Sequence, residues 1–155
     1  MLKKIVLGAL AVFVVIQFVP YGRNHSNPPV SAEPKWNRPD TRETFVRACG
    51  NCHSNETTWP WYSHVAPVSW LVQHDVDEAR ANFNISRWGS DDNEGDHAAR
   101  MLRKNRMPPR TYLAAHPEAR LSEAEKRQFI VGLEATFPEG GGRGASMGEK
   151  SGYYD

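Results

Sequence analysis

The run Cys49-Gly50-Asn51-Cys52-His53 constrains this chain more than any other feature of its sequence. In a C-x-x-C-H run, two thiols can add across the two vinyl groups of a heme, and the histidine is then held beneath the iron. Cys49 and Cys52 are the only cysteines among 155 residues, so neither thiol is reserved for another use. The run therefore predicts one covalent heme c on Cys49 and Cys52, with His53 as the proximal iron ligand.

An apolar segment at the N-terminus, residues 2–19, predicts export. Lys3 and Lys4 precede an uncharged run that ends at Val19, which is the pattern of a secretory signal. The lysines orient the rest of the chain away from the cytoplasm. No small-x-small cleavage site follows Val19, which favours an uncleaved signal-anchor. We expect residues 1–20 to hold the protein on the periplasmic side of a bacterial inner membrane, or to release it into the periplasm if they are cleaved.

Composition divides the rest of the chain into three parts. Residues 21–39 contain four prolines with Asn and Ser, which predicts an extended tether. Residues 139–155 are rich in glycine, which predicts a disordered tail. Residues 40–138 between them are enough for one small domain. No internal repeat is visible, so we expect a single heme.

The spacing of apolar residues predicts an all-α fold, in which a small cytochrome c-like domain of short helices surrounds one heme and follows an N-terminal apolar helix. Capping boxes predict that the first helix of the domain begins at Asp40 and the last at Ser122. Two further helices are expected after Pro67 and after the pair Asp91-Asp92. The residues expected to face inward on these helices are Phe45, Cys49 and Cys52; Leu71, Val72, Val76 and Ala79; Ala98, Met101 and Leu102; and Phe129, Ile130 and Leu133.

A second axial ligand is expected on the far side of the iron, and Met107 is the leading candidate. A methionine there raises the reduction potential relative to a second histidine, because the thioether favours Fe(II). Pro108 and Pro109 follow Met107, exclude a helix and hold an extended loop. A core role for Met107, His64 as the ligand, and an open site remain alternatives. Met101 is expected to pack in the core, and His116 to lie in a solvated loop. His74 and His97 are expected among acidic residues on polar helix faces.

Aromatic residues follow the heme motif directly. Trp59, Trp61 and Tyr62 are candidates for the wall of a heme pocket, and Tyr62 or a tryptophan N–H could bind a propionate. An ordinary core role for these rings remains open. Arginine can also pair with propionates, although a solvated role is the alternative for each of these three: Arg47, Arg103 and Arg106.

Residues 49–63 resemble the bacterial heme-binding domain family of small membrane-tethered c-type cytochromes, through the pattern C-x-x-C-H-S-N-x-T-x-W-P-W-Y-S. The resemblance covers about residues 36–137. It implies a heme c bonded to the two motif cysteines with His53 proximal, and it favours Met107 as the distal ligand. The resemblance continues through Ala66-Pro67-Val68-Ser69-Trp70, Asn82-Phe83, Trp88 and Met107-Pro108.

The function that these features favour is single-electron transfer by a heme protein that is not an enzyme. Its partners would be redox proteins, including membrane oxidoreductases. A heme-dependent peroxidase or sensor with an open distal site is the alternative. A dithiol redox pair or a zinc site is a weaker one, because the chain lacks a βαβ pattern and a second close ligand pair. The net charge of +1 argues against a nucleic-acid partner.

Overall fold

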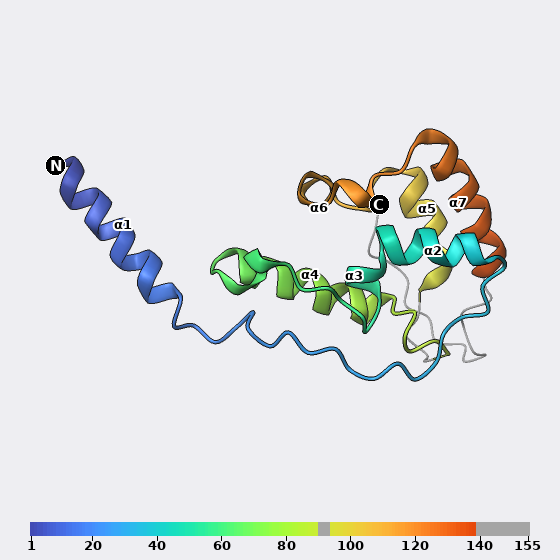
Figure 1. The fold of residues 1–155 in the computed structure, drawn as a ribbon, viewed down its shortest axis with the longest axis horizontal. Helices are drawn as coiled ribbons and strands as arrows, with labels where there is room; N and C mark the ends of the chain where they lie inside the picture. The colour runs from blue at the N-terminus through green and yellow to red at the C-terminus, as the bar shows by residue number, and fades with distance from the viewer. Residues whose placement is uncertain (90–93, 139–155) are drawn as a thin grey trace, which may run out of the picture.

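A computed structural model describes residues 1–89 and 94–138 of the chain (Figure 1). Within these residues all regular elements are helices. The only strand-like pairing there is one isolated bridge between Ala32 and Arg87. The predicted all-α class is thereby confirmed. The elements are α1 (Leu2–Ile16), α2 (Pro39–Ala48), α3 (Gly50–His53), η1 (Trp61–His64), α4 (Val68–Asn82), η2 (Gly95–His97), α5 (Ala98–Arg103), α6 (Arg110–Ala115), η3 (Pro117–Ala119) and α7 (Glu123–Thr136).

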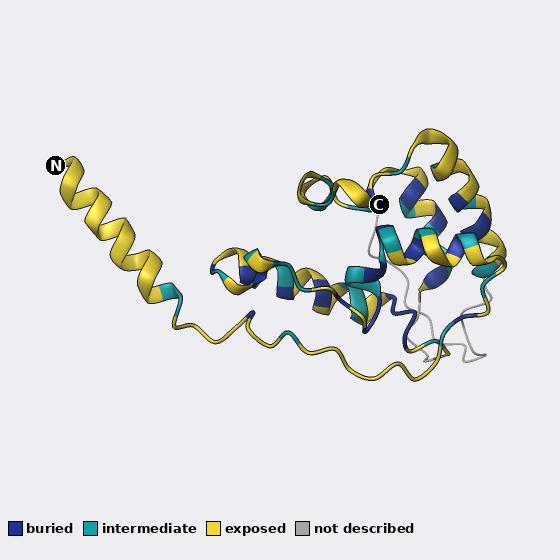
Figure 2. Cartoon of the chain, viewed as in Figure 1, coloured by how far each residue is buried: buried dark blue, intermediate teal, exposed yellow. Residues whose placement is uncertain are grey.

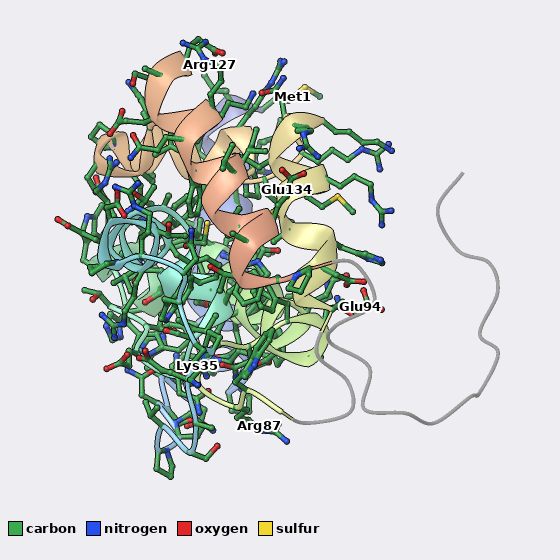
Figure 3. The ribbon with its side chains drawn as sticks, turned by 90° about the vertical axis from the view of Figure 1, so that its right-hand side faces the viewer. Met1, Lys35, Arg87, Glu94, Arg127 and Glu134 are labelled. Carbon is green, nitrogen blue, oxygen red and sulfur yellow. The ribbon has the colours of Figure 1, made fainter. Side chains whose placement is uncertain are left out.

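Helices α2, α5 and α7 pack together at one end of the molecule and turn their buried residues toward one another (Figure 2). The helices can approach closely because Gly132 of α7 lies against Thr41 of α2. Arg103 of α5 pairs with Glu134 of α7, the residue that Figure 3 labels on the face of α7 turned toward the viewer. Aromatic rings supply most of the apolar area that this core removes from water. The core consists of Phe45, Phe83, Ile85, Ala99, Leu102, Phe129, Leu133 and Phe137.

Two expected helix features differ from the structure, and a third agrees with it. The capping box at Asp40 is wrong: α2 begins one residue earlier, because Pro39 has a φ preset for the first helical position. The stripe predicted on α4 is wrong at Leu71, which is 55% exposed, while Ser69 and Gln73 face inward beside Val76. The capping box at Ser122 is present in full, with Glu125 as the reciprocal partner.

Residues 21–38 contain no helix and follow the domain along its length (Figure 1). His25 bonds to the carbonyl of Ser63, Asn27 donates to the carbonyl of Thr57, and the backbone of Ser31 donates to Ser86. The extended segment is therefore held against the domain by its own side chains and backbone, which bind carbonyls of the domain. The glycine-rich tail that the sequence predicts, residues 139–155, lies outside the described residues, as does the expected helix start at Asp91-Asp92.

Helix α1 extends away from the domain and has no buried residue, and its C-terminal end contacts the domain through Gln17 and Ala66 (Figure 2). It spans 15 residues, with Phe18 and Val19 continuing its apolar character. Among residues 1–89 and 94–138, we find no helix with both the length and the hydropathy needed to cross a bilayer.

Candidate functional site

The heme motif lies where α2 gives way to α3. Cys49 has φ −128° and ψ −24°, so it ends α2 and also caps the start of α3. The expected single helix face carrying Phe45, Cys49 and Cys52 is therefore wrong, because the helix axis changes direction at Cys49. Cys49 packs against the aromatic core, whereas Cys52 lines a cavity on the side of α4 and α6. The two cysteines therefore belong to the short turn of α3, Cys49 as its cap and Cys52 within it, and this turn is separate from α2.

Phe83 determines how the ring of His53 is presented. The Nδ1 atom of His53 lies 2.9 Å from the carbonyl oxygen of Phe83, which can only accept a hydrogen bond. Nδ1 must therefore carry the proton, and Nε2 keeps its lone pair in the neutral ring. Burial lowers the pKa of His53, which favours that neutral form. A neutral imidazole, oriented through Nδ1 by a backbone carbonyl, is the usual form of a histidine metal ligand.

Both cysteines are free thiols. Burial raises the pKa of Cys49 to about 12, with a further contribution from Cys52. Burial also raises the pKa of Cys52 to about 11, aided by the nearby charge of Asp75. Thiols of a redox pair need a lowered pKa, because the thiolate is the reactive form. The environment of these two thiols therefore argues against the dithiol alternative.

Buried polar side chains directly after the motif hold it in place. Ser54 donates from Oγ to the carbonyl of Gly50 and so closes the short helix. The backbone of Asn55 donates to Ser86 Oγ, and Thr57 donates from Oγ1 to the carbonyl of Asn51. Every one of these donors is paired within the protein, as buried polar groups require. The pattern S-N-x-T that follows the motif thus has a structural explanation: it fixes the direction of the two sulfurs and the imidazole.

Arg80 of α4 joins the motif to the extended segment. Its guanidinium donates to the carbonyl of Ser54, to Thr57 Oγ1, and to Ser26 and Asn27 of residues 21–38. A planar guanidinium with five donors can serve such divergent acceptors at one point. Neither Arg80 nor the contribution of the extended segment was found from the sequence, where a lone arginine in a helix gives no signal of its partners.

A cavity of about 50 Å³ adjoins Cys52 and is bounded by α4 on one side and α6 on the other. Tyr62, which the sequence named as a pocket residue, lies in this lining. Burial raises the pKa of Tyr112 to about 12, so its phenol stays protonated, and Asn51 of the motif donates to its oxygen. The lining includes Cys52, Tyr62, Val72, Val76, Tyr112 and His116.

His116 is a central residue of this region, so its expected place in a solvated loop is wrong. Its Nδ1 lies 2.8 Å from Glu118 Oε1, and its Nε2 lies 2.6 Å from the hydroxyl of Tyr62. The backbone N–H of Glu118 and the bond to His116 lower the pKa of that carboxyl, so the carboxylate accepts and Nδ1 donates. The Tyr62 hydroxyl and His116 Nε2 share the second hydrogen bond of the ring. Tyr112 stacks on the same ring at 4.2 Å.

The other predicted site residues are spread around the domain. Trp59 stacks on His25 at 4.5 Å, and its indole N–H is buried without a hydrogen-bond partner. Trp61 is 79% exposed and lies outside the cavity that Cys52 lines. Met107 lies on the loop after α5 and is 41% exposed, whereas Met101 is partly buried. The structure therefore brings Cys52 and Tyr62 together, and leaves the roles of the other three predictions to experiment.

The remaining histidines and arginines fall mostly in charged surroundings. As expected, His74 and His97 lie beside acidic residues, Glu78 and Glu94 respectively, each at 3.5 Å. His64 is exposed and lies edge-on to His25. Two of the arginines considered for propionates already have protein partners: Arg47 binds Glu125 and the carbonyl of Glu118, and Arg103 binds Glu134.

The chemistry of the motif fits a covalently attached heme. Two protonated thiols stand three residues apart at a short helical turn, and in the next residue Nε2 keeps its lone pair when Nδ1 carries the proton. A buried indole N–H without a partner, on Trp59, offers a donor for an acidic group. Among the described residues no cluster of three or more His, Cys, Asp or Glu could hold a bare metal ion, so the zinc alternative lacks a ligand set there.

Comparison with known proteins gave one match. A family model described as a haem-binding domain matches residues 11–135. Neither the curated proteins nor the solved structures contain a match to the chain.

Proposed function

The chain belongs to the haem-binding domain family, and from this we propose that it attaches one heme c covalently and transfers single electrons outside the cytoplasmic membrane. The observation that carries the proposal is the presentation of His53. Its Nδ1 proton is held by the Phe83 carbonyl, and the thiols of Cys49 and Cys52 precede it on the same turn. This combination supports attachment of a heme through two thioethers with His53 as proximal ligand.

When bound, the heme supplies one-electron exchange between Fe(II) and Fe(III). The chain's residues would serve to hold the group still during that exchange. The buried bonds of Ser54, Asn55 and Thr57 restrain the attachment turn, and the Phe83 carbonyl restrains the imidazole. Rigid ligands favour electron transfer because little reorganisation accompanies the change of charge. We therefore propose an electron carrier that is not an enzyme, with redox proteins as partners.

Met107 is proposed as the distal ligand. Its side chain is 41% exposed instead of filling the core, and two prolines follow it. Arg106 and Met107 both return backbone hydrogen bonds to the carbonyl of Met101, so the loop is anchored to the end of α5. A thioether on an anchored loop can serve as a ligand at low entropic cost.

Location at the membrane is the third part of the proposal. The lysines in the first turn of α1 and the exposed apolar side chains along the helix support attachment to the periplasmic face of the inner membrane. The heme domain would then work close to membrane oxidoreductases.

An optical spectrum tests the heme proposal. Protein produced in a bacterial host with heme-attachment machinery is expected to keep its color after denaturation and organic extraction, because thioether bonds survive both. Cys49→Ser/Cys52→Ser should lose the heme on extraction, and His53→Ala should keep the heme but change its ligand spectrum. Thr111→Ser, a change at an exposed site on α6, is the control. A colorless wild-type protein would refute the proposal, and a high-spin spectrum that shifts with cyanide would favour an open-site peroxidase or sensor.

A further inference from the structure

An apolar surface lies where α1 meets the domain, and we define it as the tip surface. Its residues come from the end of α1 and from the segment of η1 and the start of α4, which lie side by side in Figure 1. The exposed fractions of its side chains range from 40% for Val19 to 80% for Phe18, and Trp61 reaches 79%. The tip surface consists of Phe18, Val19, Tyr21, Trp61, Val68 and Leu71.

Gln17 clasps the two parts of the tip surface together. Its side-chain amide donates to the carbonyl of Ala66 at 3.0 Å, and its amide oxygen accepts from the Ala66 backbone at 3.0 Å. The side-chain amide of Gln17 thus binds Ala66 as a second backbone strand would. The two bonds fix the end of α1 against the residues just before α4. Gly22 tightens the contact, because a Cβ at its position would lie 2.6 Å from the carbonyl oxygen of Ser69. With φ at +76°, Gly22 also needs the freedom that only glycine has.

The two segments that form the tip surface carry no charged side chain. Residues 5–22 and 57–73 contain no Asp, Glu, Lys or Arg. Large exposed apolar groups without charges between them are rare on a surface that faces only water. Trp61 and Tyr21 are of the residue types that concentrate at the boundary between a bilayer and water. Phe18 and Val19 continue the apolar α1 directly into this surface.

We propose that the tip surface rests in the interfacial layer of the bilayer that α1 enters, so that the heme domain is held at a defined angle and is not free to swing on a tether. This inference rests on the proposed membrane attachment. The occupant is the lipid interface, because the surface is continuous with an apolar helix and the Gln17–Ala66 clasp fixes both on one side of the molecule. The α2–α5–α7 bundle lies at the other end of the domain (Figure 1).

Hydroxyl-radical footprinting of the full heme-loaded chain in phosphatidylcholine vesicles tests the inference. Trp61 is the one exposed tryptophan, whereas the other four are partly buried. In water it should therefore oxidise fastest of the five. With the tip surface in lipid, mass spectrometry should show Trp61 oxidising more slowly than Trp36, which packs beside Phe45 and Phe137 in the distant bundle.

The variant Val68→Glu/Leu71→Glu should still float with the vesicles through α1, but its Trp61 should become the fastest tryptophan to oxidise. Both positions are exposed, so an unchanged heme spectrum and circular dichroism serve as the check on folding. Rapid oxidation of Trp61 in the wild-type chain on vesicles would overturn the inference and leave membrane attachment standing. Equal protection in the variant would also overturn it. Failure of the wild-type chain to float would overturn both, independently of the heme spectrum.

Discussion

The hydroxyl of Tyr62 lies 2.6 Å from Nε2 of His116, although 54 residues separate them. This contact joins η1 to the loop after α6, and Glu118 and Tyr112 hold the same imidazole from two other sides. The contact forms one wall of the cavity beside Cys52. In this structure the Tyr62 hydroxyl therefore binds His116, whereas the sequence made it a candidate partner for a heme propionate.

Tyr62→Phe is expected to destabilise the domain by about 1–2 kcal/mol, because Nε2 of a partly buried imidazole loses its hydrogen-bond partner. Denaturant unfolding measures the loss, and hydrogen exchange should show reduced protection in α6. Trp61→Phe is the matched control: the adjacent ring is exposed, so its stability should stay within about 0.5 kcal/mol of the wild-type value. Equal stability of Tyr62→Phe and the control would show that the contact contributes nothing.

The raised pKa values of the motif thiols predict slow alkylation in the heme-free protein. Cys49 and Cys52 have pKa values of about 12 and about 11, above the ordinary 9.0. A raised pKa means less thiolate at neutral pH, so iodoacetamide should react roughly tenfold or more slower than with the unfolded chain at pH 8. The rate should climb with pH up to about 11, where Cys52 ionises. Reaction as fast as in the unfolded chain would contradict the buried setting of both thiols.

Met107→Leu is expected to remove the sulfur-to-iron charge-transfer band of the oxidised protein and to lower its reduction potential. Leucine keeps the volume of the side chain but cannot ligate iron, and a thioether favours Fe(II). Met101→Leu is the matched control and should keep the band, since Met101 is expected to pack in the core. If the band survives in Met107→Leu and is lost in the control, the two roles are exchanged. If the wild-type protein shows no such band, Met107 is not the distal ligand and His64 becomes the next candidate.

Gly132→Ala should destabilise the domain even though alanine is the better helix former. In an ordinary helix interior, replacing glycine with alanine would raise the free energy of unfolding by about 0.5–1 kcal/mol. At Gly132 the new Cβ would lie 2.3 Å from Thr41 Oγ1 and 2.8 Å from Thr41 Cγ2, and overpacking of this kind costs about 1–3 kcal/mol. We expect a net loss in thermal unfolding experiments.

The double variant Thr41→Ala/Gly132→Ala supplies the control for that prediction. It removes both atoms that the new methyl group would meet most closely, so part of the stability should return. A double variant that is less stable than both single variants would show that the loss in Gly132→Ala does not come from a clash with these two Thr41 atoms.

Local chemistry explains what could be predicted from the sequence. The C-x-x-C-H turn, the helical class and the full capping box at Ser122 depend on residues within a few positions of one another. Family membership was likewise legible in the motif and the residues after it. Errors arose even at short range where two local signals compete, as when Pro39 starts α2 ahead of the expected cap at Asp40.

The sequence by itself determined the reactive groups, which are two thiols and one histidine. It also determined that the N-terminal helix is apolar. Only the tertiary structure decided which proton His53 carries, since that depends on the carbonyl of Phe83, 30 residues away. It also decided that His116 meets Tyr62 and that Gln17 meets Ala66. Partners far apart in the chain leave no periodic or compositional trace, because a polar side chain can satisfy its hydrogen bond with any group that the fold brings within reach.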